Sequence, residues 1–249
     1  MPAQHQACPS RDSLHRRGFL TGSCAAATMA LVGAGVFRDI AYAEALTRAD
    51  RDKLTPDEIL ELMKKGNTRF YTGKREAHNF LAQQRASAAG QHPAAVLLSC
   101  IDSRAPAELI MDLRIGDIFN SRVAGNVESS DILGGMEFAC KLSGAKVVLV
   151  MGHTACGAIK GAIDDAELGN LTGLLAKIKP AVVATTYAGE RTSKNYAFVD
   201  AVARKNVELT IANIRKDSPV LADMEQTGKI KIAGAMYNLA TGVIDFFAA

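Results

Sequence analysis

Short apolar runs alternate with longer amphipathic segments along most of the chain. Residues 94–100 and 146–152 are almost wholly apolar, which is typical of strands buried on both faces of a parallel sheet. Residues 118–123 predict a third strand, and residues 129–143 carry apolar side chains at helical spacing. Because a helix between two such strands forms a βαβ unit, the pattern predicts an α/β fold with a central, mainly parallel sheet flanked by helices.

Two helices are predicted before the first strand, where they form an N-terminal helical arm. Thr55, Pro56 and Asp57 supply an N-cap, a proline at the first helical position and an acidic first turn. A helix that ends near Tyr71 is therefore expected. Residues 76–90 predict a second helix that ends at a glycine.

The remainder of the chain predicts two helices followed by strands that close the sheet. The expected helices span residues 171–183 and 198–216. The expected strands span residues 229–235 and 237–247 and close the sheet around Thr241-Gly242. The sequence contains no repeat, low-complexity tract or interdomain linker. A single folded domain is therefore expected.

The first forty-odd residues differ in composition from the rest. Arg16 and Arg17 precede Gly-Phe-Leu, an Ala- and Gly-rich stretch covers residues 21–37, and residues 41–43 read Ala-Tyr-Ala. A basic start, an apolar stretch and a small-x-small cleavage motif resemble a twin-arginine export signal.

The predicted mature protein begins at Glu44. Residues 1–43 are expected to be the signal peptide and residues 44–249 the functional domain, which would be periplasmic or secreted. The alternative is a membrane anchor, but Arg38 and Asp39 interrupt the stretch before it reaches the roughly 20 apolar residues that span a bilayer. No later stretch is apolar enough, so no membrane association is expected after cleavage.

Charge and cysteine content narrow the chemistry. The formal net charge is +3, and the basic residues are interspersed with acids, which argues against nucleic-acid binding. Cys100, Cys140 and Cys156 lie beyond the predicted signal. An odd number fits a disulfide framework poorly even in an oxidising compartment, so a bound metal better explains thiols there.

Candidate ligands follow two of the predicted strands. Cys100, Asp102 and Arg104 alternate after the first strand, so an extended segment would point all three to one side. His153 and Cys156 follow the strand over residues 146–152, and the carboxyl ends of neighbouring parallel strands meet.

A set of two cysteines and one histidine is one of the three-ligand shells of catalytic zinc, which leaves the fourth position for water or substrate. A single buried cysteine is more often a small hydrophobic residue, and a single histidine in a turn is more often a hydrogen-bonding group. The combination at two strand ends favours a metal site. Cys140 lies among apolar residues in the predicted helix and is expected in the core.

Two motifs carry a family resemblance. The motif CxDxR at residues 100–104, followed by HxxCG at residues 153–157, resembles the β class of carbonic anhydrases. The similarity extends over about residues 50–249 and includes Gly-Asp-Ile-Phe at 116–119 and Arg-Val-Ala-Gly-Asn at 122–126.

The resemblance implies a role for each motif residue. It implies one Zn²⁺ per chain and reversible hydration of carbon dioxide to bicarbonate and a proton, by a hydroxide held on the zinc and oriented by an Asp/Arg dyad. The implied zinc ligands are Cys100, His153 and Cys156, the dyad is Asp102 and Arg104, and the substrate-binding residues are Gln91, Gly157, Phe119, Ala124 and Phe138. Gln91 would come from a partner subunit, so a homodimer or dimer of dimers is expected.

The sequence departs from the family pattern at three positions. Phe138 stands where plant relatives carry tyrosine, and Ala124 stands where many members carry valine. Members whose aspartate moves onto zinc at lower pH carry tryptophan where this chain has Leu97, and this chain has no tryptophan. We therefore expect Asp102 to remain paired with Arg104. A role for His92 as proton carrier is a further hypothesis.

Two other functions remain open at this stage. On the same fold, the site would also suit hydrolysis of carbonyl sulfide or carbon disulfide. A zinc-binding or thiol redox protein would use Cys100 and Cys156 but would need neither Asp102 nor Arg104. A phosphate-binding loop is excluded, because residues 152–160 lack the Gly-Lys-Ser/Thr sequence.

Overall fold

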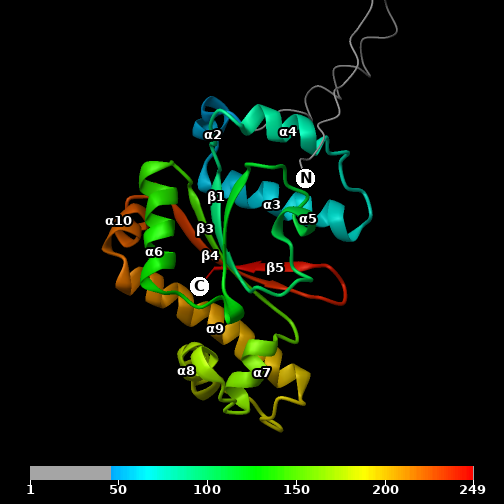
Figure 1. The fold of residues 1–249 in the computed structure, drawn as a ribbon, viewed down its shortest axis with the longest axis vertical. Coiled ribbons are helices and arrows are strands. Elements are labelled where there is room, and N and C mark those ends of the chain that lie inside the picture. The colour runs from blue at the N-terminus through cyan, green and yellow to red at the C-terminus, as the bar shows by residue number, and fades with distance from the viewer. Residues whose placement is uncertain (1–45, 249) are drawn as a thin grey trace, which may run out of the picture.

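The computed structural model describes residues 46–248, in which a five-stranded sheet is covered by helices on both faces (Figure 1). The strand order is β2-β1-β3-β4-β5, and only β5 runs antiparallel to its neighbour. The strands are β1 (Ala95–Ser99), β2 (Ile118–Arg122), β3 (Val147–His153), β4 (Lys231–Tyr237) and β5 (Ile244–Phe247). The predicted α/β class with a mainly parallel central sheet is confirmed. The predicted signal at residues 1–43 lies outside the described residues.

The central strands are buried on both faces, as their apolar sequences predict. Every residue of β1 and β3 is buried. Leu97 and Leu149 pack in one cluster with Met63, whereas Leu98 and Val150 pack in a second cluster on the opposite face. Alternation of side chains between the two faces of a strand produces this division.

Different helices cover the two faces of the sheet. Helix α3 lies over one face, whereas α6, α9 and α10 lie over the other (Figure 1). Helices α7 and α8 sit beyond the carboxyl end of β3 (Figure 1). The helices are α2 (Arg48–Lys53), α3 (Pro56–Tyr71), α4 (Phe80–Ser87), α5 (Ala107–Ile110), α6 (Ser130–Glu137), α7 (Gly157–Ile163), α8 (Gly169–Ala184), α9 (Tyr196–Asp217) and α10 (Pro219–Gln226). None of these described helices combines the length and apolar character needed to cross a membrane.

The predicted helix over residues 129–143 differs from the observed one. The α-helix α6 ends at Glu137 and continues as a π-helix over Phe138–Leu142, in which the Ser143 N–H donates to the Phe138 carbonyl. The wider turn brings the adjacent residues Ala139 and Cys140 both to the buried side, whereas Phe138 is half exposed. The prediction that Cys140 belongs to the core is confirmed.

Other helices and strands differ from their predicted boundaries where the pattern of apolar residues is weak. The helix predicted for residues 76–90 is only α4, because Asn79 caps it and its side chain accepts from the Ala82 N–H. The two strands predicted to close the sheet around Thr241-Gly242 are present as β4 and β5, and the turn between them contains both residues. The turn is longer than expected, so β5 keeps only the last four residues of the predicted span 237–247. The short helices α2, α5, α7 and α10 were not predicted. A Ser218-Pro219 start signal marks α10 in the sequence.

Candidate metal centre and active site

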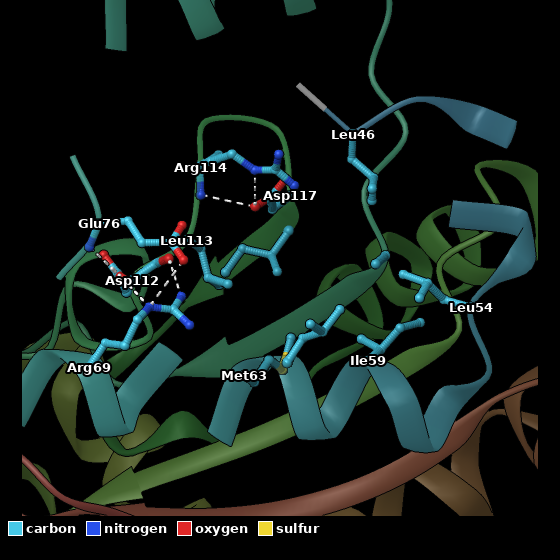
Figure 2. Close-up of a pocket in the computed structure, with 13 residues that line it drawn as sticks. Leu46, Leu54, Ile59, Met63, Arg69, Glu76, Asp112, Leu113, Arg114 and Asp117 are labelled. Carbon is cyan, nitrogen blue, oxygen red and sulfur yellow. Dashed lines mark hydrogen bonds and ion pairs between the residues drawn. The ribbon is translucent and has the colours of Figure 1, made fainter. Parts of the chain in front are cut away.

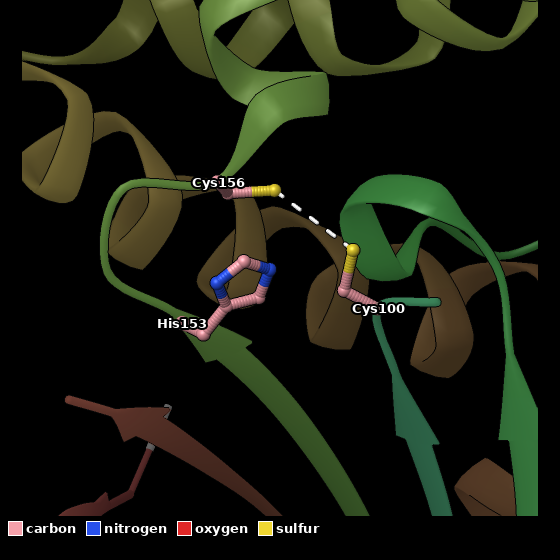
Figure 3. A group of neighbouring side chains, drawn as sticks. All are labelled: Cys100, His153 and Cys156. Carbon is pink, nitrogen blue, oxygen red and sulfur yellow. Dashed lines mark hydrogen bonds between the residues drawn. The ribbon is translucent and has the colours of Figure 1, made fainter. Parts of the chain in front are cut away.

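Neighbouring strands place three candidate ligands together. Cys100 directly follows β1, His153 is the last residue of β3, and Cys156 is the N-cap of α7. Because β1 and β3 pair in parallel with Ser99 opposite Met151, their carboxyl ends lie level. The two sulfur atoms are 3.9 Å apart, and the three ligand atoms all lie within 4.8 Å of one another (Figure 3).

The ligand atoms are buried and available to a cation. His153 Nδ1 lies 2.9 Å from the Thr154 carbonyl, to which it donates, and this leaves the Nε2 lone pair for a metal. Nε2 is buried and has no hydrogen-bond partner among the described residues. Cys100 and Cys156 are free thiols with 4% and 1% exposure. An orphaned nitrogen beside two thiols fits a soft divalent cation.

Only one of the two neighbouring thiols ionises readily in the metal-free site. The neighbouring Cys156 and the Gly125 N–H, which lies 3.4 Å from the sulfur, hold the pKa of the Cys100 thiol well below its ordinary value. The Cys100 sulfur and burial raise the pKa of Cys156 far above its ordinary value. A cation bound between them would allow Cys156 to ionise as well, because metal coordination deprotonates a thiol outright.

A carboxylate–guanidinium pair lies beside the three ligands. Asp102 Oδ1 accepts from the Arg104 backbone N–H at 2.9 Å and from Nε at 2.9 Å, and Oδ2 accepts from Nη2 at 2.7 Å. These bonds, which outweigh the opposing effect of partial burial, hold the pKa of Asp102 well below its usual range. Oδ2 also lies 3.8 Å from His153 Nε2. The carboxylate is thus ionised and close to the ligand set.

The segment after Cys100 is a turn. The prediction that it continues as an extended chain was wrong, because the Arg104 N–H folds back onto the Asp102 side chain. Arg122 at the end of β2 holds this turn from the side: its Nε donates to the Cys100 carbonyl at 2.9 Å and its Nη2 to the Asp102 carbonyl at 2.5 Å. Sequence reasoning missed this role, although the parallel pairing of β1 and β2 would place Arg122 there.

Gly157 lies at the mouth of the ligand set. It is the first residue of α7, so its backbone N–H has no acceptor within the helix. It is exposed, and a Cβ added at this position would meet no atom within 4 Å. The open space and the available N–H suit the binding of substrate oxygens.

The predicted apolar pocket residues lie along the β2 edge. Phe119 and Phe138 meet edge to face, with ring centroids 6.2 Å apart. Phe119 is level with Val96, four residues before Cys100, which corresponds to about 13 Å along a strand. Ala124 begins a 3-10 turn whose next residue, Gly125, contacts the Cys100 sulfur. Within one chain, only Ala124 adjoins the ligand set.

Gln91 lies at the opposite end of β1 from the ligands. It is an exposed residue in the loop that precedes the strand. The five residues of β1 separate it from Cys100, a length of about 16 Å. One chain therefore does not bring Gln91 to its own ligand set.

A separate cavity of about 250 Å³ lies between α3 and the amino ends of β1 and β2 (Figure 2). Its walls are mainly apolar, and Asp112 lies at one side with Arg69 directed toward it. Asp112 is buried and accepts from Arg69 Nε at 2.6 Å, from Arg75 Nε at 3.1 Å and from the Glu76 N–H at 3.1 Å, and it pairs with His78 at 2.9 Å. None of the three candidate ligands lines this cavity.

Fold and site together define an α/β protein with a Cys-His-Cys ligand set at the carboxyl ends of neighbouring parallel strands. Comparison with known proteins gives the family. The family model described as carbonic anhydrase matches residues 95–244. The chain is 33% identical over 193 residues to carbonic anhydrase 2 of Mycobacterium tuberculosis, which covers 75% of this chain and 90% of the relative. It is 31% identical to a carbonic anhydrase of Mycolicibacterium smegmatis, with 76% and 92% covered.

Comparison with solved structures also finds β-carbonic anhydrases. The β-carbonic anhydrase CafA of Aspergillus fumigatus superposes with a TM-score of 0.58 at 29% identity, covering 66% of this chain and 79% of that one. A tetrameric β-carbonic anhydrase of Sordaria macrospora gives 0.57 at 26% identity, covering 65% and 84%. The chain therefore belongs to the carbonic anhydrase family, in its β class. The resemblance inferred from the two sequence motifs is confirmed.

Proposed function

We propose that Cys100, His153 and Cys156 hold one zinc ion, and that the enzyme interconverts carbon dioxide and bicarbonate there. The observation that carries the proposal is the buried, unpartnered Nε2 of His153 within 4.8 Å of two free thiol sulfurs. Two thiolates and one imidazole suit zinc, and three protein ligands leave a fourth position for substrate chemistry. When bound, zinc lowers the pKa of a water and so supplies hydroxide near neutral pH.

Asp102 orients the attacking group in this proposal. It accepts a hydrogen bond as an anion, because Arg104 keeps the pKa of its carboxyl low. Arg104 also holds the carboxylate through two side-chain bonds, and Arg122 fixes the backbone carbonyls on which the pair is mounted. Orientation by a fixed acceptor directs an oxygen lone pair toward the carbon of carbon dioxide.

Gly157 and Gln91 stabilise the charge that develops on the substrate oxygens. A backbone N–H aimed at a developing oxyanion contributes about 3 kcal/mol in other enzymes. Gly157 offers such a donor next to Cys156. Gln91 lies too far from the ligands of its own chain, so we propose that it reaches the site of a partner subunit.

A homodimer or dimer of dimers would complete the pocket. Phe119 and Phe138 lie along the edge strand β2, where the sheet is open on one side. Phe138, Ile101 and Leu81 are 50%, 60% and 69% exposed in the single chain, and burial of such side chains favours association. Together with Ala124, the two phenylalanines would form an apolar wall for carbon dioxide.

Loss of ligands tests the metal assignment. Cys100→Ser, His153→Ala and Cys156→Ser each remove one of three protein ligands, so elemental analysis should find little or no zinc. Cys140→Ser is the matched control, since it also replaces a buried cysteine but should retain zinc. Full zinc in all three ligand variants would refute the site. Parallel assays of carbon dioxide, carbonyl sulfide and carbon disulfide decide the substrate.

We further propose that residues 1–43 direct export by the twin-arginine route, so that residues 44–249 function in the periplasm or outside the cell. The support is the sequence pattern alone, because these residues lie outside the described part. Replacing Arg16 and Arg17 with lysine should retain the protein in the cytoplasm, as measured by cell fractionation. Unchanged export of the double variant would refute the proposal.

A further inference from the structure

The turn that joins His153 to Cys156 has a strained backbone. Ala155 adopts a φ of 54°, a left-handed conformation that residues with a side chain rarely populate. Only Thr154 and Ala155 separate the two ligands, so the conformation of Ala155 sets the position of Cys156 relative to His153. Such a conformation persists only where the surrounding structure holds it.

Two sets of contacts hold this turn. The Thr154 N–H donates to the Tyr237 carbonyl at 3.0 Å, and its Oγ1 accepts from the Leu239 N–H at 3.0 Å, so the end of β4 holds the first half. The Ala155 N–H donates to Asp200 Oδ1 at 2.7 Å. The strained residue is thus held by a carboxylate from helix α9.

The same helix supports the other half of the ligand set. Asn206 Nδ2 donates to the Gly125 carbonyl at 2.7 Å, and the Gly125 N–H in turn contacts the Cys100 sulfur at 3.4 Å. Val199 and Val202 of α9 are fully buried in the cluster that contains Cys100 and Cys156. Helix α9 is therefore fixed by packing against the ligand residues, and its Asp200 side chain reaches the turn.

We propose that Asp200 is a positioning residue of the metal centre: its carboxylate keeps Ala155 in the left-handed conformation and so sets the separation of the His153 and Cys156 ligand atoms. The charged acceptor makes this bond stronger than a neutral one. Residues that do not bind the metal but hold its ligands in place by hydrogen bonds contribute to metal affinity, so their removal weakens metal binding. The inference rests on the zinc site proposed above.

Zinc affinity measured against a chromophoric chelator tests the role. Asp200→Ala should weaken zinc binding about 10- to 100-fold, the usual effect of losing an outer support. Asp200→Asn should give an intermediate affinity, because its amide oxygen still accepts but carries no charge. Asp223→Ala, which removes an exposed carboxylate from α10, is the control and should leave the affinity unchanged.

A double variant separates positioning from general stability. Glycine adopts positive φ without steric cost, so Ala155→Gly should need less support from Asp200. The loss of zinc affinity caused by Asp200→Ala should then be smaller in the Ala155→Gly background. The ligand-field absorption of the Co²⁺-substituted Asp200→Ala protein should also shift, because the ligand geometry changes.

Three results would overturn the inference. Asp200→Ala could bind zinc as tightly as the wild type while only its melting temperature falls, which would make Asp200 merely structural. Asp200→Ala could lose the same affinity in both backgrounds, which would show that the conformation of Ala155 is not what Asp200 supports. If Asp200→Ala does not fold, a wild-type affinity in Asp200→Asn with an unshifted Co²⁺ spectrum would be decisive. A wild-type protein without zinc affinity would overturn the proposed function as well.

Discussion

Asp102 accepts three hydrogen bonds from a single residue, Arg104, and both of its carboxylate oxygens take part. The Arg104 side chain is 60% exposed, whereas the Asp102 side chain is 14% exposed, so the acid lies toward the interior and the base toward solvent. A carboxylate held in this way still retains lone pairs, which can accept a hydrogen bond at the proposed reacting centre.

The dyad predicts a loss of turnover without loss of zinc. Asp102→Asn lacks the anionic acceptor, and Arg104→Ala leaves Asp102 without its anchor, so kcat for carbon dioxide hydration should fall at least about 100-fold in each. Zinc content should stay at one per chain, as measured by elemental analysis. A crystal structure near pH 7 with Asp102 on zinc, or undiminished turnover in Arg104→Ala, would contradict this reading.

Mixed dimers test whether Gln91 acts across an interface. If it does, a dimer of one Gln91→Ala subunit and one His153→Ala subunit keeps one complete site, because each chain supplies what the other lacks. A dimer of one wild-type subunit and one subunit with both substitutions keeps zinc in a site without its glutamine, so its kcat should fall about 100-fold, the usual effect of losing one such donor. Tagged subunits allow each mixed dimer to be purified and assayed. The reverse order of activities would place Gln91 in its own chain's site.

The buried carboxylate of Asp112 predicts pH-dependent stability. Burial alone would raise the pKa of Asp112, but the bonds from Arg69, the Glu76 N–H and His78 lower it overall. Asp112→Asn leaves the cations without their partner and should cost about 3 kcal/mol of unfolding free energy at pH 7. Urea unfolding measures this difference.

The sign of the pH effect follows from the lowered pKa. The stabilisation by Asp112 is complete above the unfolded value of about 3.9 and is lost as the pH falls through the lower folded value. The difference between wild type and Asp112→Asn should therefore shrink in acid. Asp223→Asn, at an exposed site, should show no difference at either pH. An equal loss at pH 7 and in acid would refute the electrostatic cause.

The two ligand sulfurs predict a redox liability of the metal-free protein. They are 3.9 Å apart, and a disulfide requires about 2.05 Å, so a small movement suffices. Oxidised glutathione should accept two electrons from Cys100 and Cys156 through a mixed disulfide and release two reduced glutathiones. Cys140 should remain a thiol, because burial raises its pKa to about 12.

Mass spectrometry after alkylation counts the remaining thiols. The metal-free mature protein, residues 44–249, contains only Cys100, Cys140 and Cys156, so it should show one alkylated cysteine after oxidation and denaturation. The zinc-loaded mature protein should resist internal disulfide formation. Cys140→Ser should show none after oxidation, since the internal disulfide does not depend on it. Equal oxidation of the metal-free and zinc-loaded proteins would show that the metal does not protect these sulfurs.

The sheet could be predicted because each central strand is an uninterrupted apolar run. The apolar strands β1 and β3 begin and end within about one residue of their predicted positions, and so does the less apolar edge strand β2. Burial on both faces leaves a signal in composition alone, and ligands that follow such strands share an edge by topology. The family motifs then assigned a role to each candidate residue.

Features that depend on contacts across space could not be predicted. The π-helix after Glu137 changes the spacing of buried residues, which an α-helical period does not anticipate. Asp200 and Asn206 support the ligands through hydrogen bonds to backbone atoms. Every residue type has the same backbone groups, so the sequence does not reveal such a partner. The turn between Asp102 and Arg104 is likewise set by a side-chain bond to the main chain.

The parallel pairing of β1 with β3 has a consequence for folding kinetics. Cys100 and Cys156 are 56 positions apart, and a parallel crossover must close before their sulfurs meet. Closing such a long loop costs conformational entropy before the non-local contacts can form. We therefore expect these two residues to meet late in folding. Zinc then has no complete site in the folding transition state, so it should slow unfolding while leaving the folding rate nearly unchanged. Slow unfolding of the zinc-loaded protein would suit the export of a folded chain that is proposed above.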